Sequence, residues 1–261
     1  MFDDKDPTAA PEEVRRRASI DARERISIWD GSGSLHGLRI GVPREYFPAE
    51  LSPEIRERVR AVVSRLQAKG AAVVSVSLPS TSYALSAYYV LASAEASSNM
   101  ARYDGVEYGY QEETPAGADV TRAGRVYAHT RTAGFGREVQ KRVLLGTYAL
   151  TASAYDNYFL QAQRVRELVK ADFERVFVLA DHLRGCRGAD DGVDVMMHAS
   201  GIGEAPVLGD ERGLETYVED VLTVPASLAG LPAVSIGGVS VVGQWGSDAL
   251  VMRVGAMAGV P

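Results

Sequence analysis

The sequence predicts an α/β protein, and two observations lead to this fold class. The first is a strand–helix–strand unit over residues 38–76, in which two short apolar runs flank a segment with helical periodicity. The second is that strand-like and helix-like segments continue to alternate along the rest of the chain. Because the strands of such a unit are parallel, we expect a mixed or mainly parallel sheet flanked by helices.

The strand–helix–strand unit has clear boundary residues. Its strands, Leu38–Val42 and Ala72–Val76, are apolar runs, of which the first is ended by Pro43 and the second is closed by Pro79. Ser52 is a suitable N-cap with Pro53 at the first helical position, and Gly70 is a suitable end. Between these residues the apolar side chains have helical spacing, at Ile55, Val59, Val62, Val63 and Leu66.

The later elements follow from the same two periodicities. We expect helices at Ser82–Arg102, Phe135–Leu150, Ser153–Phe177, Leu214–Leu222 and Asp248–Ala258. We expect strands at Val193–Met197 and Pro232–Ile236, and a loop at Tyr103–Thr132, which is rich in glycine and threonine.

Composition narrows the class of protein. The 261 residues are 46% hydrophobic and 24% charged, with a net charge of -6, so the chain is a poor candidate for binding nucleic acid through charge alone. No apolar run is long enough for a transmembrane helix, so no membrane partner is expected. Residues 1–37 form a charged N-terminal segment ending in a Gly/Ser linker, and residues 38–261 are expected to form the folded domain.

Several short motifs have structural explanations. The glycines of Gly31–Gly37 precede a strand, whereas a phosphate-binding loop follows one. Ser97 and Ser98 lie in a helical pattern, where they serve packing. The single cysteine, Cys186, has arginine neighbours that could lower its pKa, but no catalytic partner is identifiable. The histidines lack metal-ligand spacing, so no metal site is expected, and we place them at the surface or in turns: His36, His129, His182 and His198.

Three polar residues are candidates for ligand binding. Arg142 lies in a helical segment, and a guanidinium can hold a carboxylate through two hydrogen bonds. Asp220 ends a helical stretch, where its carboxylate could accept from an ammonium group, and Tyr88 could offer a hydroxyl at a pocket wall. From the residues alone, a structural ion pair or a core tyrosine is the more economical explanation of each.

Six dispersed parts of the sequence carry a family resemblance. They are Gly41–Tyr46, Glu95–Asn99, Arg102–Val106 with Tyr108–Tyr110, Gly134–Val139, Arg142–Leu150, and Tyr217–Asp220 with Leu228–Pro232. In this order they resemble the amidase signature family, and within it the A-type subunits of glutamyl-tRNA(Gln) amidotransferases. The resemblance runs from about Asp4 to the C-terminus. It implies an α/β fold of the amidase-signature type, with a mixed sheet flanked by helices.

The resemblance also implies an activity and partners. Such subunits hydrolyse glutamine, and the ammonia reaches the B subunit, where ATP and Mg activate Glu-tRNA(Gln) for amide formation. A small C subunit holds the assembly together, tRNA binds mainly through the B subunit, and no cofactor is expected in this chain. The setting is the mitochondrial matrix or the bacterial cytoplasm, of which the mitochondrion is favoured. The family's chemistry uses a nucleophilic serine, a bridging serine and a lysine base.

The sequence departs from the family at the catalytic residues. It contains no Gly-Gly-Ser-Ser-Gly stretch, and none of its lysines (Lys5, Lys69, Lys141 and Lys170) follows an apolar strand as the base would. We therefore expect the second half of the fold, without the Ser-Ser-Lys residues and inactive alone. We also expect that a strand of the family fold is missing before Val242.

The resemblance assigns a glutamine-binding role to the three candidates. It places the group that holds the α-carboxylate at Arg142, the group that pairs with the α-ammonium at Asp220, and a pocket hydroxyl at Tyr88. Two alternatives stay open: an amidase of the same family acting on another amide, and a non-catalytic interaction protein.

Overall fold

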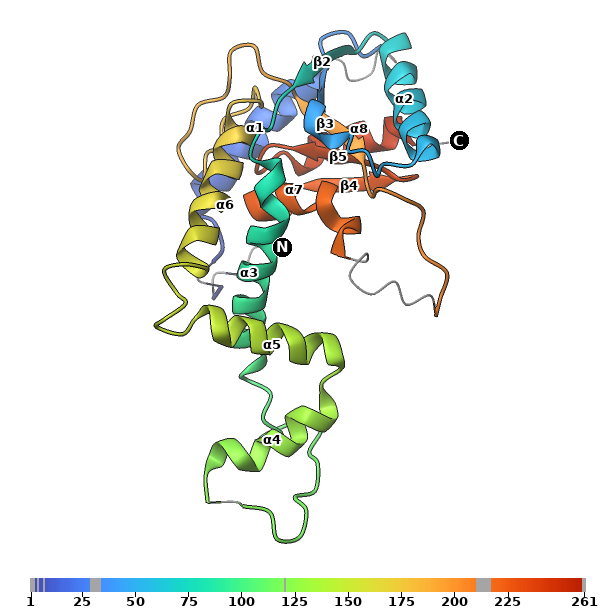
Figure 1. Ribbon diagram of the computed structural model, residues 1–261. Helices are drawn as coiled ribbons and strands as arrows, with labels where there is room; N and C mark the ends of the chain where they lie inside the picture. Colours follow the sequence, from blue (N-terminus) through green and yellow to red (C-terminus); the bar gives the residue numbers. More distant parts are fainter. Residues whose placement is uncertain are drawn as a thin grey trace. The chain divides into compact units, whose positions relative to one another are not determined.

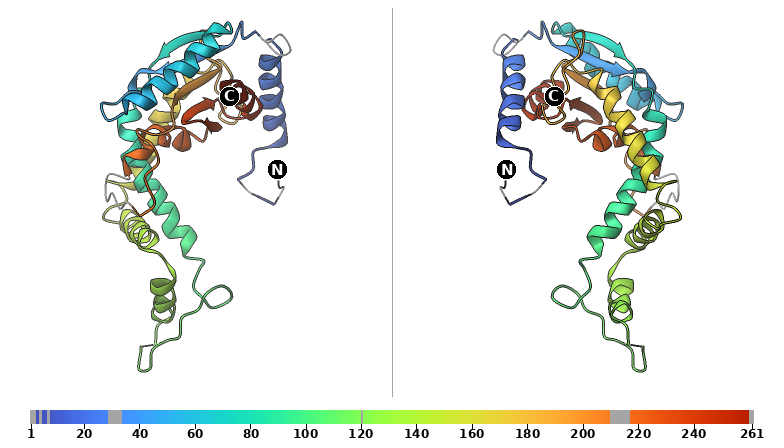
Figure 2. Two further views of the ribbon diagram at one scale, coloured as in Figure 1. Left: turned by 90° about the vertical axis from the view of Figure 1, so that its right-hand side faces the viewer. Right: turned by 90° about the vertical axis from the view of Figure 1, so that its left-hand side faces the viewer.

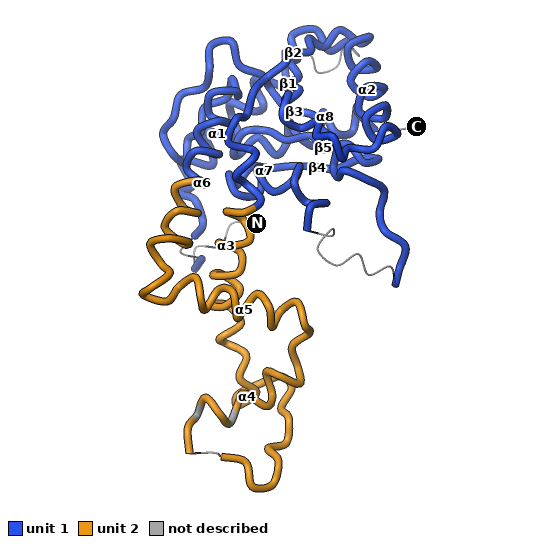
Figure 3. Tube along the Cα trace, viewed as in Figure 1, with its two compact units in different colours: residues 1–85, 166–261 blue, residues 86–165 orange. Residues whose placement is uncertain are grey.

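The structure is a computed structural model that describes residue 3 and residues 5–6, 8–28, 34–119, 121–209 and 217–259. It divides into two compact units (Figure 3), which we describe separately. The first unit comprises residues 1–85 and 166–261, and the second comprises residues 86–165. The helices α3 (Thr81–Met100) and α6 (Phe159–Glu174) each contribute residues to both units.

The first unit contains a five-stranded mixed sheet in the order β2-β1-β3-β5-β4 (Figure 1). β1 (Arg39–Pro43) pairs in parallel with β2 (Ala72–Val76) and with β3 (Val195–Ala199). β5 (Val239–Gly243) runs antiparallel to β3, and β4 (Ala233–Ile236) runs antiparallel to β5. The expected mixed α/β sheet and the parallel pair β1–β2 are confirmed.

The helices of this unit cover the sheet. α2 (Pro53–Ala68) contacts β3, and α8 (Asp248–Ala258) contacts β4 and β5. α1 (Glu12–Ser27) packs against α8, as both views of Figure 2 show. The short elements are η1 (Arg44–Tyr46), η3 (Glu219–Leu222) and α7 (Val224–Ala229). Every residue of β3 and β5 is buried, so both faces of the sheet centre are covered.

The N-cap predicted for α2 is confirmed. The Ser52 hydroxyl accepts a hydrogen bond from the backbone N–H of Ile55 at 3.2 Å, and Pro53 occupies the first turn. The four buried apolar residues of α2 are Ile55, Val59, Val62 and Leu66. Local sequence therefore places both the start and the buried face of this helix.

The expectation of a missing strand before Val242 is wrong. Strand β5 is present and occupies an inner position between β3 and β4. It is joined to β4 by the two residues Gly237 and Gly238, whose φ angles are 57° and 81°. A two-residue hairpin with positive φ at both positions matches the twist of the strands, and glycine adopts it without strain. The connection between β4 and β5 is therefore only two residues long, and strand β5 is present.

Helix α1 is joined to the core by a buried ion pair. The Asp194 carboxylate is fully buried and pairs with the guanidinium of Arg25, whose Nη2 lies 3.2 Å from Oδ2. The same carboxylate accepts from the backbone N–H of Arg39 at 2.7 Å. The expected division at residue 37 stays a prediction, and the linker residues 29–33 lie outside the described residues.

The second unit is helical and differs from expectation in one segment. Residues 103–132 are predicted to be a loop, but α4 (Ala123–Gly134) forms within and just beyond the end of this range. Its last turn is fixed by tertiary contacts, since Arg131 Nη1 donates to the carbonyl oxygens of Met100 at 2.8 Å and Tyr103 at 3.3 Å. Such long-range contacts can stabilise a helix whose own sequence does not favour it. The second unit also contains α5 (Arg137–Ala149).

Among the described residues, no helix combines the length and the apolar character needed to cross a bilayer.

Candidate functional site

The geometry around Arg142 is set by close packing of α5 against α3. Gly146, one turn after Arg142, is buried, and a Cβ at this position would overlap the carbonyl oxygen of Ser93. The hydroxyls of Ser97 and Thr147 also lie 3.1 Å apart across this contact. Residues four apart share a helix face, so Arg142 lies on the side of α5 that faces α3.

Arg142 stacks on a tyrosine and has no acidic partner in the described part of the chain. Its guanidinium carbon lies 5.9 Å from the ring centroid of Tyr89, and the side chain is half-buried. No carboxylate of a described residue lies within salt-bridge distance of it. A ring holds a guanidinium by its face and leaves the hydrogen-bonding edge available to a carboxylate.

Tyr88 lies in the same unit as Arg142. It is half-buried, and its ring meets that of Tyr89 edge-on, with centroids 5.3 Å apart and an angle of 74° between the ring planes. Tyr89 therefore contacts both predicted site residues of this unit. Tyr89 is not predicted as a site residue from the sequence, in which its only signal is its position next to Tyr88.

Asp220 belongs to the first unit. It lies in η3, is exposed, and its carbonyl oxygen accepts from the N–H and the hydroxyl of Thr223 at 3.0 and 3.2 Å. Its carboxylate makes no hydrogen bond or ion pair to any residue that the structure describes. Of the helix expected at 214–222, residues 214–216 lie outside the described residues, and the described part forms only the short η3.

The other polar motifs have structural roles. Ser97 bonds Thr147 across the helix contact, as expected for helix packing. Burial raises the pKa of the Cys186 thiol, and the Glu174 carboxylate adds to this; together they outweigh the lowering by Arg184, so the net shift of the pKa is upward. Lys141 and Lys170 each pair with a glutamate one turn earlier in the same helix. No cluster of metal-ligating side chains occurs among the residues described.

The surface placement expected for all four histidines is wrong for His198. This residue lies on β3 and is 1% exposed. Its Nδ1 donates to the carbonyl oxygen of Ala199 at 2.7 Å, and its ring meets that of Tyr46 edge-on at 4.7 Å. Nε2 has no hydrogen-bond partner within the described residues, and burial lowers the pKa of the imidazole to about 4.

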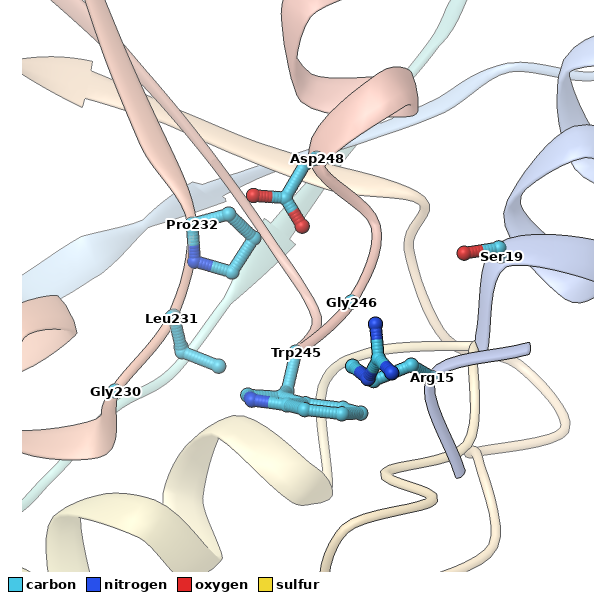
Figure 4. Close-up of a pocket in the computed structure, with 8 residues that line it drawn as sticks. All are labelled: Arg15, Ser19, Gly230, Leu231, Pro232, Trp245, Gly246 and Asp248. Atoms are coloured by element: carbon cyan, nitrogen blue, oxygen red, sulfur yellow. The ribbon is translucent and has the colours of Figure 1, made fainter. Parts of the chain in front are cut away.

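A cavity of about 400 Å³ lies in the first unit (Figure 4). Arg15 and Ser19 of α1 face it from one side, and Trp245, in the segment before α8, and Asp248, the first residue of α8, face it from another. Gly230–Pro232, part of a segment that carries the family resemblance, completes the wall. None of Tyr88, Arg142 and Asp220 lines this cavity.

Comparison with known proteins gives a matching family model and similar proteins that share one name. The sequence model of the Amidase family matches residues 9–249. The chain is 47% identical over 280 residues to the A subunit of the mitochondrial glutamyl-tRNA(Gln) amidotransferase of Mycosarcoma maydis, covering 97% of this chain and 50% of that protein. It is 42% identical to the corresponding protein of Podospora anserina, covering 97% and 55%. The chain thus spans about half the length of the curated relatives it matches.

Solved structures support the same fold. The crystal structure of the A subunit of glutamyl-tRNA(Gln) amidotransferase from Thermotoga maritima aligns with a TM-score of 0.57 and 27% identity, over 85% of this chain and 42% of that one. A vestigial protein complex, described as revealing the evolutionary origins of an s-triazine catabolic enzyme, aligns with a TM-score of 0.61 and 20% identity, over 98% of this chain and 48% of that one, which supports the fold alone. Sequence and fold agree over most of the chain, and it belongs to the amidase family.

Proposed function

We propose that the chain is the glutamine-recognising part of the A subunit of a glutamyl-tRNA(Gln) amidotransferase. The observation that carries the proposal is Arg142, a half-buried guanidinium that rests on Tyr89 and has no carboxylate partner in the described chain. The fungal relatives, which bear this subunit's name, support it.

The chemistry of glutamine explains why the pair of charged residues matters. Free glutamine is a zwitterion, so its binding site needs a cation for the α-carboxylate and an anion for the α-ammonium. We assign these roles to Arg142 and Asp220, and we assign Tyr88 a hydroxyl contact. Each charge-assisted hydrogen bond contributes about 1.5–3 kcal/mol. An amidase acting on a neutral amide would not need either charge.

Amide hydrolysis is assigned to residues that this sequence lacks. The chain has no Gly-Gly-Ser-Ser-Gly stretch to supply a nucleophile and a bridging serine. We therefore propose that the chain alone releases no ammonia from glutamine. In the assembled enzyme, the B and C subunits would be its partners, ATP, Mg and most tRNA contacts would belong to the B subunit, and the mitochondrial matrix would be its location. Serine-dependent release of ammonia by the purified chain would contradict the first statement.

Calorimetric titration with glutamine tests the binding assignment. Arg142→Ala is expected to weaken glutamine binding by about tenfold or more, a loss of at least about 1.4 kcal/mol. Glutamine α-amide lacks the carboxylate, so its affinity should not change in this variant. Arg137→Ala, which removes an exposed arginine from the same helix, is the matched control. Unchanged glutamine affinity in Arg142→Ala would remove Arg142 from the site, and the Asp220→Asn variant tests the ammonium contact with N-acetylglutamine in the same way.

A further inference from the structure

The cavity drawn in Figure 4 is not used by the glutamine proposal, and it has the size of a small-molecule site. Its volume of about 400 Å³ lies within the range of roughly 300–1,000 Å³ that is typical of ligand pockets. All of its lining residues belong to the first unit. We call it the tryptophan pocket, after Trp245 in its lining.

Close packing brings the two sides of the tryptophan pocket together. Gly246 has a φ of 80°, and a Cβ there would lie only 2.5 Å from the Cβ of Ala18. The turn before α8 therefore lies directly against α1. Arg15 and Ser19 are three residues before and one residue after Ala18, and residues 15 and 19 share one face of the helix. The glycine contact thus places both side chains beside the turn that carries Trp245.

Hydrogen bonds fix the remaining walls of the tryptophan pocket. The backbone N–H of Trp245 donates to Oε1 of Gln244 at 2.7 Å, and Gln244 is only 2% exposed. The N–H of Gly243 donates to the carbonyl oxygen of Pro232 at 3.1 Å, which joins this wall to the end of β5. Walls that are fixed in this way cost a ligand little ordering on binding.

The lining of the tryptophan pocket carries one cation and one anion. Among the described residues that line it, Arg15 and Asp248 are the two that carry charge, and Figure 4 shows them approaching the pocket from different elements. Within the described chain, the Asp248 carboxylate makes no hydrogen bond and no ion pair. Nε of Arg15 donates to the carbonyl oxygen of Ala10 at 3.0 Å, which holds the guanidinium at the pocket. A ligand that has both a carboxylate and an ammonium group matches these two charges.

The uncharged lining favours an apolar side chain on that ligand. Trp245 is half-buried, and Leu231 and Pro232 add aliphatic surface to the same pocket. An indole stacks on aromatic rings and attracts an ammonium group to its face. The side chain of glutamine ends in a polar amide and gains little from these walls. A nucleotide base could stack on the indole, but its phosphate would be repelled by the Asp248 carboxylate.

We propose that the tryptophan pocket binds a free α-amino acid with an aromatic or large apolar side chain. Arg15 pairs with the α-carboxylate, Asp248 pairs with the α-ammonium group, and Trp245 packs against the side chain. The residues assigned to glutamine do not line this pocket, so the proposal does not depend on glutamine binding.

Fluorescence titration of the full chain with L-phenylalanine tests the proposal. The chain contains two tryptophans, so in the Trp29→Phe variant Trp245 is the only one left to report binding. We expect a saturable change in its emission at millimolar concentration or below. Phenylalaninamide lacks the carboxylate and N-acetylphenylalanine lacks the ammonium group, so each should bind about fivefold more weakly or worse.

Two variants in this background assign the charges. Arg15→Ala should weaken phenylalanine binding by about fivefold and leave phenylalaninamide binding unchanged, whereas Arg17→Ala, which removes an exposed arginine of the same helix, should have no effect. Asp248→Asn should weaken phenylalanine binding by about fivefold and leave N-acetylphenylalanine binding unchanged. Its control is Glu50→Gln, which removes an exposed carboxylate elsewhere in the first unit.

The circular dichroism melting curve of each variant must match that of its parent, and the two analogues test the proposal without Arg15 or Asp248 being changed. No saturable change in Trp245 emission would overturn the proposal. Equal affinity for phenylalanine and both analogues would also overturn it, as would tighter binding of adenosine monophosphate than of phenylalanine.

Discussion

Because the imidazole of His198 is buried, we predict that the folded protein loses stability in mild acid. The imidazole is buried with a pKa of about 4, whereas the same group titrates near 6.5 in the unfolded chain. Below pH 6.5 the unfolded state binds a proton that the folded state does not, so stability falls as the pH decreases. The fall ends near pH 4, where both states are protonated. Its full size is about 3 kcal/mol, because each tenfold difference in proton affinity is worth about 1.36 kcal/mol.

Urea unfolding followed by circular dichroism measures this effect. Between pH 8 and pH 5 the His198 contribution works out at about 2 kcal/mol. Carboxylates titrate in part of the same range, so the comparison with a variant isolates the imidazole. His198→Met lacks the ionisable group, and its free energy of unfolding should fall by about 2 kcal/mol less than that of the wild type. His36→Gln, at an exposed position, should follow the wild type. Parallel curves for wild type and His198→Met would refute the reasoning.

Two further predictions concern packing. Arg25→Ala leaves the buried Asp194 carboxylate without its cation and should lower the free energy of unfolding by about 3 kcal/mol. Urea unfolding at pH 7 measures this loss. Arg16→Ala, on the exposed side of α1, is the control and should lower the free energy of unfolding by less than about 1 kcal/mol. Gly146→Ala places a methyl group on the Ser93 carbonyl oxygen, so α5 must move from α3; the melting temperature should drop, whereas an unchanged value would show that the helices are not in close contact.

The sequence was informative where local rules decide the structure. The Ser52 N-cap and the parallel pairing of β1 with β2 follow from side-chain spacing and from the handedness of strand–helix–strand units. Helix α4 was not predicted because the contacts that stabilise its last turn are long-range: Arg131 donates to carbonyl oxygens about 30 residues earlier in the chain. Strand β5 was not predicted because the family resemblance suggested that a strand before Val242 is missing. The strand is present, and Gly237 and Gly238 form a two-residue hairpin that joins it to β4.

His198 shows a different limit. Where one face of a sheet meets solvent, successive residues of a strand alternate between the buried and the exposed face. In such a strand, the position of a histidine in the alternation predicts whether it is exposed. Strand β3 has neighbours on both sides and buried residues on both faces, so alternation carries no information about exposure. Only the position of the strand in the sheet decides that the imidazole is buried.

Arg142 illustrates why the site residues required a family resemblance. In sequence, an arginine that binds a ligand and an arginine that pairs with a neighbouring carboxylate look the same, since both interrupt an apolar helix face. They differ in a tertiary property, the presence of a nearby carboxylate, and the described chain provides none for Arg142. A half-buried guanidinium is costly to leave without an anion, because partial burial weakens its hydration. The ring of Tyr89 offsets part of this cost, and a ligand carboxylate is the group that would offset the rest.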